Sequence, residues 1–430
     1  MPALFNLEKH DSTVKREIVA GVTTFMTMAY ILAVNPDILS TTGMDKGAVF
    51  TATVLASVIG TLVMAFAANL PFAMAPGMGL NAYFAYTVVL GMGYSWQTAL
   101  TAVLIEGIIF LVLTGLNVRE AIVNSIPVCL KHAISVGIGL FIAMIGLQNA
   151  GIIVSDQNTL VTLGNLDNPA VWLSLSGIIL IGVLLILRVK GAILLGIFTI
   201  TLVGVPLHIT HLPQEGVAGM PPSISPTFLQ FDLESIFNPD ILIVLFTFLF
   251  VDMFDTVGTL VGVSSKTEML DDRGRIPRAR QALFADAVGT TVGALLGTST
   301  VTTYVESAAG VAEGGRTGLT TLVVAALFLL SLFFAPVFLM IPGAATAPAL
   351  VIIGTFMFSP VLKIDLENYL DAIPAFLTVI MMPLTYSISE GIVFGILSYV
   401  LVRLLSGKTR ELSPAVVILA ILFILKLILS

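Results

Sequence analysis

Long apolar segments, separated by short polar stretches, make up most of this chain. A helix needs about 20 apolar residues to cross a lipid bilayer. The segments that approach this length predict an all-α, polytopic membrane protein with fourteen spans, at residues 18–38, 48–69, 73–90, 97–117, 126–147, 170–188, 190–209, 240–263, 281–297, 302–313, 318–340, 344–361, 371–388 and 390–405. A further apolar stretch, 414–429, is not assigned to a span.

The composition supports a membrane protein. Only 10% of the residues are charged and 57% are hydrophobic, whereas a soluble domain carries about 25% charged residues. The single cysteine, Cys129, excludes a disulfide within the chain, and the four histidines form no metal-ligand pattern, so we expect no metal and no cofactor. The polar N-terminal residues and the length of the first apolar segment also predict no cleavable signal peptide.

Basic residues are distributed unequally between the two sides of the predicted membrane. If the N-terminus is cytoplasmic, every lysine and arginine except Lys46 and Lys426 falls on the cytoplasmic side of the fourteen spans. Because cytoplasmic loops are enriched in these residues, this distribution supports fourteen spans with a cytoplasmic N-terminus. The short loops favour a location in the cell membrane. The cations of residues 266–280 are interleaved with acids, so we do not expect this loop to bind nucleic acid.

The two halves of the chain resemble each other weakly. The stretch beginning at Gly191 recurs loosely at Gly391, and the stretch around Gly60 recurs around Gly293. Both matches relate spans that lie seven apart, which predicts a repeat of seven plus seven spans. Because seven is odd, the second repeat enters the membrane from the opposite side. In such an inverted repeat the binding site is expected at the midplane, near interrupted helices.

The third and tenth spans are predicted to be interrupted. Pro71, Pro76, Gly77 and Gly79 oppose a regular helix in the third span. The tenth span begins with Gly-Thr-Ser-Thr-Val-Thr-Thr-Tyr at 297–304, where β-branched residues favour an extended chain. Since non-helical backbone at membrane depth must be buried or line a cavity, we expect two short strands to meet there, beside two half-helix N-termini. Alternatively, the glycines only permit close helix packing.

Two acidic residues within apolar segments are the main candidates for a functional site: Asp255 in the eighth span and Glu306 in the tenth. A carboxylate near the bilayer centre costs roughly 2.5–3.5 kcal/mol on insertion scales, so it marks a functional site by default. The alternative is a structural carboxylate that caps a broken helix. Asp252 is a second choice and a candidate interhelix hydrogen-bond partner. We expect Glu106 to pair locally and Asp286 to cap or gate the ninth span.

Several motifs together carry a resemblance to a known family. They are Thr24-Phe-Met-Thr27-Met-Ala-Tyr30, Asn35-Pro36, Ala75-Pro-Gly-Met-Gly-Leu-Asn81-Ala-Tyr-Phe-Ala-Tyr86, Asp255-Thr-Val-Gly-Thr259 and Thr302-Thr-Tyr-Val-Glu306-Ser-Ala-Ala-Gly310. From about Gly21 to Leu405 the chain resembles the nucleobase–cation symporter family, part of the nucleobase–ascorbate transporter superfamily. Within that family it is similar to the AzgA-like adenine/guanine/hypoxanthine permeases.

The resemblance implies the fold of the uracil permease, with a core domain and a gate domain. It places the core in residues 18–117 and 240–340, the gate in 118–209 and 341–405, and an apolar C-terminal tail in 406–430. It further implies secondary active uptake of purine nucleobases, coupled to protons, by an elevator or rocking mechanism, and a homodimer in the lipid bilayer. Coupling to Na⁺ and the preferred purine stay open.

The same resemblance assigns roles to individual residues. It places the family's span-eight carboxylate at Asp255, its span-ten glutamate at Glu306 and its span-three polar residue at Asn81. The expected substrate site and its secondary candidates further include Ala82, Tyr83, Thr259, Tyr304 and Val305, and then Thr27, Asp252 and Ser307. Both histidines of the uracil branch are missing from the eighth span, which disfavours uracil and leaves proton coupling to Asp255 and Glu306.

We therefore expect a neutral purine to dock between the third and tenth spans. Asp255 and Glu306 would accept hydrogen bonds from its N–H groups, and the amide of Asn81, which both donates and accepts, would complete the edge. An anion exchanger on the same fold is the nearest alternative, although two acids repel an anion. A uracil- or xanthine-type transporter and a passive channel are further alternatives. An enzyme is not expected, because the sequence shows no nucleophile, metal or cofactor constellation.

Overall fold

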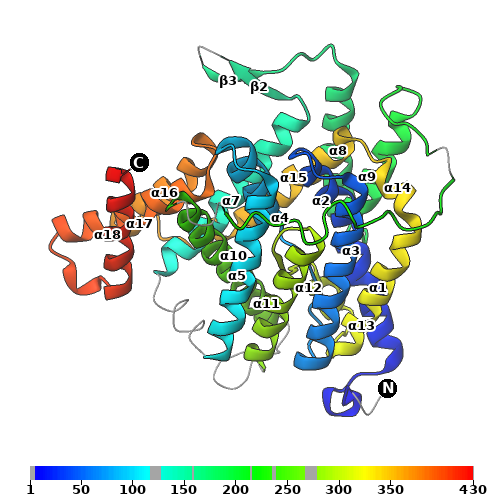
Figure 1. Cartoon of the computed structure of the whole chain (residues 1–430), viewed down its shortest axis with the longest axis horizontal. Coiled ribbons are helices and arrows are strands. Elements are labelled where there is room, and N and C mark those ends of the chain that lie inside the picture. Colours follow the sequence, from blue (N-terminus) through cyan, green and yellow to red (C-terminus); the bar gives the residue numbers. More distant parts are fainter. Residues whose placement is uncertain are drawn as a thin grey trace.

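The computed structural model describes residues 5–116, 127–156, 159–213, 216–234, 239–266 and 278–429 (Figure 1). Its α-helices are α1 (Val14–Met28), α2 (Ile31–Ser40), α3 (Lys46–Val63), α4 (Met78–Ala82), α5 (Trp96–Gly115), α7 (Val128–Asn149), α8 (Pro169–Ile186), α9 (Ala192–Gly204), α10 (Pro239–Lys266), α11 (Ala279–Leu296), α12 (Ser307–Ala312), α13 (Gly318–Ser331), α14 (Ala335–Leu339), α15 (Gly343–Phe358), α16 (Tyr369–Leu384), α17 (Ile388–Leu405) and α18 (Pro414–Leu429). Two π-helical segments, η2 (Met64–Ala68) and η3 (Tyr83–Gly91), continue α3 and α4. The strands are β1 (Met74–Pro76), β2 (Ile153–Asp156), β3 (Leu160–Leu163) and β4 (Val301–Thr303).

Most of the predicted spans correspond to long apolar helices. Within the described residues, eight helices are long and apolar enough to cross a membrane, judged by length and composition alone. Shorter apolar helices occupy four more stretches, namely Ala192–Gly204, Ile241–Met253, Tyr369–Leu384 and Pro414–Ile424. α11 fills the predicted ninth span. The number of membrane crossings and their direction stay predictions, and part of the supporting charge, in residues 267–277, lies outside the described residues.

The helices pack in two sets. In one set α3 contacts α2, α11 and α13, α5 contacts α10 and α11, and α1 contacts α12 and α13. In the other set α7 contacts α15 and α16, α16 contacts α17, and α15 contacts α8 and α9. Figure 1 shows α16, α17 and α18 at one side of the molecule, and the β2–β3 hairpin projecting at one end. Residues 117–126, at the start of the predicted gate domain, are not described.

The first predicted span is divided. Instead of one continuous helix, α1 ends at Met28 and α2 begins at Ile31, so that Ala29 and Tyr30 form the junction. No proline or glycine occupies this junction, and the sequence pattern therefore did not indicate it. Tyr30, at this junction, is buried and 1% exposed.

The predicted strands in the third and tenth spans are confirmed. β1 and β4 pair antiparallel, with Met74 opposite Thr303 and Pro76 opposite Val301. The pairing is extended by hydrogen bonds from the Gly77 N–H to the Thr300 carbonyl (2.9 Å) and from the Tyr304 N–H to the Ala73 carbonyl (3.0 Å). α4 follows directly after β1, and α12 follows β4, so each interrupted span is a strand continued by a short helix.

Side chains satisfy the outer edges of this two-stranded unit. The Thr61 hydroxyl accepts from the Met74 N–H (3.0 Å) and donates to the Met74 carbonyl (3.2 Å). The Ala73 N–H donates to the Ser307 hydroxyl (3.0 Å), and the Thr290 hydroxyl donates to the Val301 carbonyl (3.0 Å). Backbone outside a helix is tolerated at membrane depth only when its polar groups find such partners. These threonines and this serine therefore explain how two short strands can exist here.

Candidate functional site

Asp255 and Glu306 both lie beside the β1–β4 pair. Asp255 lies in the middle of α10, and Glu306 is the residue that precedes α12. Both residues are partly exposed, whereas Glu106, Asp252 and Asp286 are 0% exposed. Partial exposure distinguishes the two acidic residues that a ligand can reach from those that are enclosed by protein.

Gly77 lies between β1 and the carboxyl group of Asp255. A β-carbon at Gly77 would stand 3.5 Å from Asp255 Oδ2 and 2.6 Å from Thr302 Cγ2. The absence of a side chain therefore lets β1 approach both β4 and α10. The sequence left two interpretations of Gly77 open, an interruption of the third span or close packing. In the structure Gly77 serves both, because it lets the end of β1 lie close to β4 and α10.

Glu306 is held by residues from the first span. The Tyr30 hydroxyl donates to Glu306 Oε1 at 2.6 Å. The Thr27 hydroxyl lies 3.5 Å from the Glu306 carbonyl oxygen, at the limit of a hydrogen bond. The Tyr30 and Tyr304 rings lie 6.5 Å apart, and the Tyr304 hydroxyl donates to the Pro76 carbonyl at 2.5 Å, across the strand pair. Sequence reasoning did not assign a role to Tyr30, although a tyrosine in an apolar segment normally needs a partner for its hydroxyl.

Asp252 and Asp286 form a separate, fully enclosed cluster. The Thr256 hydroxyl lies 2.5 Å from Asp286 Oδ1, 3.3 Å from Asp252 Oδ1 and 2.6 Å from the Thr302 hydroxyl. These contacts join α10, α11 and β4. The contact of Asp252 with Thr256 lies within α10, so the interhelix role expected for Asp252 stays a prediction, while Thr256 makes the links to α11 and β4. The capping role expected for Asp286 is wrong, because Asp286 lies inside α11 and bonds to another helix.

Glu106 also bonds over a long range. Its Oε2 accepts from the Thr300 hydroxyl at 2.6 Å, 194 residues away in the chain. The expectation of a local partner is therefore wrong for this contact. α5 carries Glu106 next to the segment that leads into β4, and the fold, not the neighbouring sequence, supplies the partner.

Asn81 and Tyr83 lie behind the strand pair. The Asn81 side chain is 0% exposed, and its Oδ1 accepts from the Ser299 hydroxyl, which links α4 to the residues before β4. Tyr83 is also 0% exposed and packs edge-on against Phe248, with ring centroids 4.9 Å apart. The neighbouring Ala82 is buried too. The structure thus places these three residues as supports of the broken third span, and their contact with a substrate stays a prediction.

Some of the remaining candidate residues are exposed at the site, and others are buried residues that support it. Thr259 is partly exposed, four residues after Asp255 on α10, and Val305 is 49% exposed. Ser307 is 0% exposed, and its hydroxyl accepts a hydrogen bond from the Ala73 N–H. Within the described residues no group of three or more His, Cys, Asp or Glu side chains is arranged to hold a metal ion.

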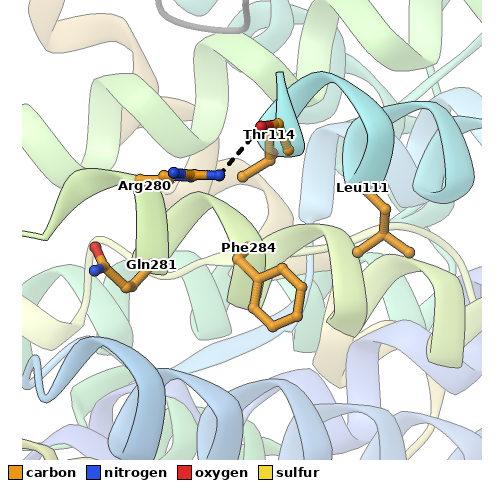
Figure 2. A pocket seen from close by; sticks show the side chains of 6 residues that line it. Leu111, Thr114, Arg280, Gln281 and Phe284 are labelled. Atoms are coloured by element: carbon orange, nitrogen blue, oxygen red, sulfur yellow. Dashed lines mark hydrogen bonds between the residues drawn. The ribbon is translucent and has the colours of Figure 1, made fainter. Parts of the chain in front are cut away.

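A cavity of about 350 Å³ lies elsewhere, between the end of α5 and the start of α11 (Figure 2). Leu111, Thr114, Arg280, Gln281 and Phe284 line it, together with Gly115. Within this lining, the Arg280 guanidinium donates a hydrogen bond to the Gly115 carbonyl at 3.1 Å. None of the candidate site residues lines this cavity, so it is separate from the carboxyl groups at the strand pair.

Sequence comparison places the chain among permeases. Residues 15–426 match a family model described as a permease family. The chain is 54% identical to a putative permease of Methanocaldococcus jannaschii, with 99% of this chain and 97% of the relative covered. It is 44% identical to the adenine permease AdeP of Escherichia coli, covering 99% and 95%. It is 45% identical to the guanine/hypoxanthine permease PbuG of Bacillus subtilis, covering 99% of both chains.

Two solved structures share the fold at low sequence identity. The transmembrane domain of the cyanobacterial bicarbonate transporter BicA matches with a TM-score of 0.67 and 18% identity, over 87% of this chain and 97% of that chain. The murine Slc26a9 anion transporter, in its inward-facing state, matches with a TM-score of 0.66 and 12% identity, over 93% and 71%. These matches confirm a mostly helical membrane protein of the seven-plus-seven type. They concern the fold alone, because one fold can host different functions.

Proposed function

The chain belongs to the permease family, and we propose that it imports purine nucleobases, namely adenine, guanine or hypoxanthine, by proton symport. It is a multi-pass membrane transporter and not an enzyme. Relatives that match 99% of the chain at 44% and 45% identity are an adenine permease and a guanine/hypoxanthine permease. The resemblance of the motifs around Asn81, Asp255 and Glu306 supports the same substrate class.

The observation that carries the proposal is the pair of partly exposed acidic residues, Asp255 and Glu306, beside the β1–β4 pair. Carboxylate oxygens accept hydrogen bonds, and a purine offers ring N–H and exocyclic amine donors to such acceptors. An anion such as bicarbonate would be repelled by the same groups. The site chemistry therefore favours a neutral, donor-bearing ligand, although the fold is shared with anion transporters.

Proton coupling is assigned to the same two residues. Burial disfavours the charged form of a carboxyl group, so a carboxyl group inside a membrane protein can take up and release a proton. In the proposed cycle, proton and purine bind together between the broken spans. The core, 18–117 and 240–340, then moves against the gate, 118–209 and 341–405, by an elevator or rocking motion, and 406–430 forms a tail. A homodimer, a cytoplasmic N-terminus and a cell-membrane location complete the proposal.

The test is uptake of radiolabelled hypoxanthine into proteoliposomes, with and without an inward proton gradient. Unlabelled adenine, guanine, uracil, sulfate and bicarbonate serve as competitors. We expect uptake that the gradient drives and that purines block, while uracil and both anions leave it unchanged. Uptake that is independent of the proton gradient but driven by a Na⁺ gradient would show that Na⁺, and not the proton, is the coupling ion. Transport of bicarbonate or sulfate without purine uptake would overturn the proposed substrate class.

A further inference from the structure

The hydroxyl of Tyr30 has a defined place in the site. Tyr30 occupies the junction between α1 and α2, and its side chain is 1% exposed. A buried phenol without a partner is costly, so its hydroxyl bonds within the protein. The partner is Glu306 Oε1, at 2.6 Å, across 276 residues of sequence. The first span thereby reaches the carboxyl group of the tenth.

The difference in exposure between these two residues decides their roles. Glu306 is partly exposed, whereas Tyr30 is enclosed, so a ligand at the strand pair can meet Glu306 but not the phenol. Tyr30 donates to Oε1 and thereby restricts the rotation of the carboxyl group. A phenol is also a neutral donor at ordinary pH, so it supports the acceptor form of Glu306 without adding charge.

Helix packing around Tyr30 fixes the position of Tyr30 relative to Glu306. α1 packs against α12, the short helix that begins directly after Glu306. A β-carbon at Gly310, in α12, would stand 2.6 Å from the Ala20 carbonyl oxygen of α1. This close approach of the two helices sets the distance between the α1–α2 junction and Glu306. The hydrogen bond is therefore a consequence of helix packing and not of a flexible contact.

We propose that Tyr30 is a positioning residue, which fixes the carboxyl group of Glu306 so that it accepts a hydrogen bond from an N–H group of the purine. The inference rests on the proposed function and deepens it, because it names the residue that orients one of the two acceptors. Loss of the phenol hydroxyl should weaken substrate recognition while the aromatic ring preserves the packing. The step of transport after binding should be less affected.

The experiment compares hypoxanthine uptake by the wild-type protein and Tyr30→Phe in proteoliposomes. We expect KM to rise about tenfold, the scale of one lost hydrogen bond to a charged group, with kcat changed less than threefold. The control is Tyr399→Phe, a buried tyrosine whose ring faces Arg403 at 3.7 Å and lies outside the site. This control should leave KM unchanged. Size-exclusion profiles and melting temperatures of both variants check that they fold.

A second measurement tests whether Tyr30 acts through Glu306. In Glu306→Gln, hypoxanthine binding is measured by calorimetry before and after Tyr30→Phe is added, and no further loss is expected. Infrared difference spectra of protein labelled with ¹³C-glutamate should show a shifted carboxylate band in Tyr30→Phe. An unchanged KM in Tyr30→Phe, with normal uptake by the wild type, would overturn the positioning role alone. Absence of purine uptake by the wild type would overturn the proposed function and this role with it.

Discussion

The helices around the β1–β4 pair and the helices around α7 and α15 differ in what holds them together. In the first region, buried polar side chains join different elements: Asn35 bonds to Thr53 (2.7 Å) and Thr298 (2.9 Å), and Thr61 bonds to Met74 (3.0 Å). In the second region, Ser174 of α8 bonds to the Ala344 carbonyl of α15 (2.9 Å), but the buried Thr201 and Thr378 bond to carbonyls four residues earlier in their own helices.

Close backbone approach also holds the second region together, as it does between α1 and α12 in the first. A β-carbon at Gly139 of α7 would stand 2.8 Å from the Gly354 carbonyl oxygen of α15. One at Gly137 would stand 2.6 Å from the sulfur of Met382 in α16. Small residues of this kind let helices pack closely in membranes without hydrogen bonds between them. We infer that hydrogen bonds from buried side chains contribute more to holding together the region with the carboxyl groups than the region predicted to be the gate.

The largest effect is expected from removing either acceptor at the site. Asp255→Asn and Glu306→Gln should each reduce gradient-driven hypoxanthine uptake at least about 100-fold, since each replaces a carboxylate acceptor and a proton carrier. Proteoliposome uptake measures this. Glu367→Gln, on an exposed turn, is the matched control and should transport normally. Wild-type uptake by either site variant would contradict the assignment.

A large structural effect is expected from Gly77→Ala. The new β-carbon would meet Thr302 Cγ2 at 2.6 Å, so β1 and β4 must separate and the strand hydrogen bonds weaken. We expect loss of binding together with a lower melting temperature. Gly182→Ala is the control, because a β-carbon at Gly182 has nothing within 4 Å and alanine favours a helix interior. A normal melting temperature in Gly77→Ala would show that the strand pair is not tightly constrained.

An intermediate effect is expected from Gly139→Ala in the second region. Overpacking between α7 and α15 should destabilise the protein by about 1–3 kcal/mol. Purine affinity, measured by calorimetry at a temperature where the variant is folded, should stay close to the wild-type value, since α7 and α15 carry none of the site residues. If affinity fell together with stability, the two regions would not be independent.

The smallest predicted effect on stability tests the comparison between the two regions most directly. Thr61→Val removes a hydroxyl that serves both the N–H and the carbonyl of Met74, and should cost about 1–3 kcal/mol because a buried N–H loses its partner. Thr201→Val removes the same atom where it bonds only to a carbonyl of its own helix. Its cost should stay below about 1 kcal/mol. Melting temperatures in one detergent compare the two, and equal losses would contradict the distinction.

Much of the fold could be predicted from local sequence. The length of apolar segments locates the helices, since the bilayer thickness demands about 20 apolar residues. Pro71, Pro76 and Gly77 mark the interruption of the third span, and the threonine-rich run at 297–304 marks that of the tenth. These signals are local properties of the backbone, so they act before any tertiary contact forms. Asp255 and Glu306 could be identified as candidates from the sequence, because inserting an acidic residue into the membrane has a high free-energy cost.

Tertiary structure alone decided which polar groups meet. Nothing near Tyr30 in the sequence indicates a break in the first span or a partner 276 residues away. Asn81 reaches Ser299, Glu106 reaches Thr300, and Asp286 reaches Thr256 instead of capping its helix. A buried polar atom must find a partner, but many hydroxyl groups in this chain could serve. The choice depends on which helices pack together, and that is a property of the whole fold.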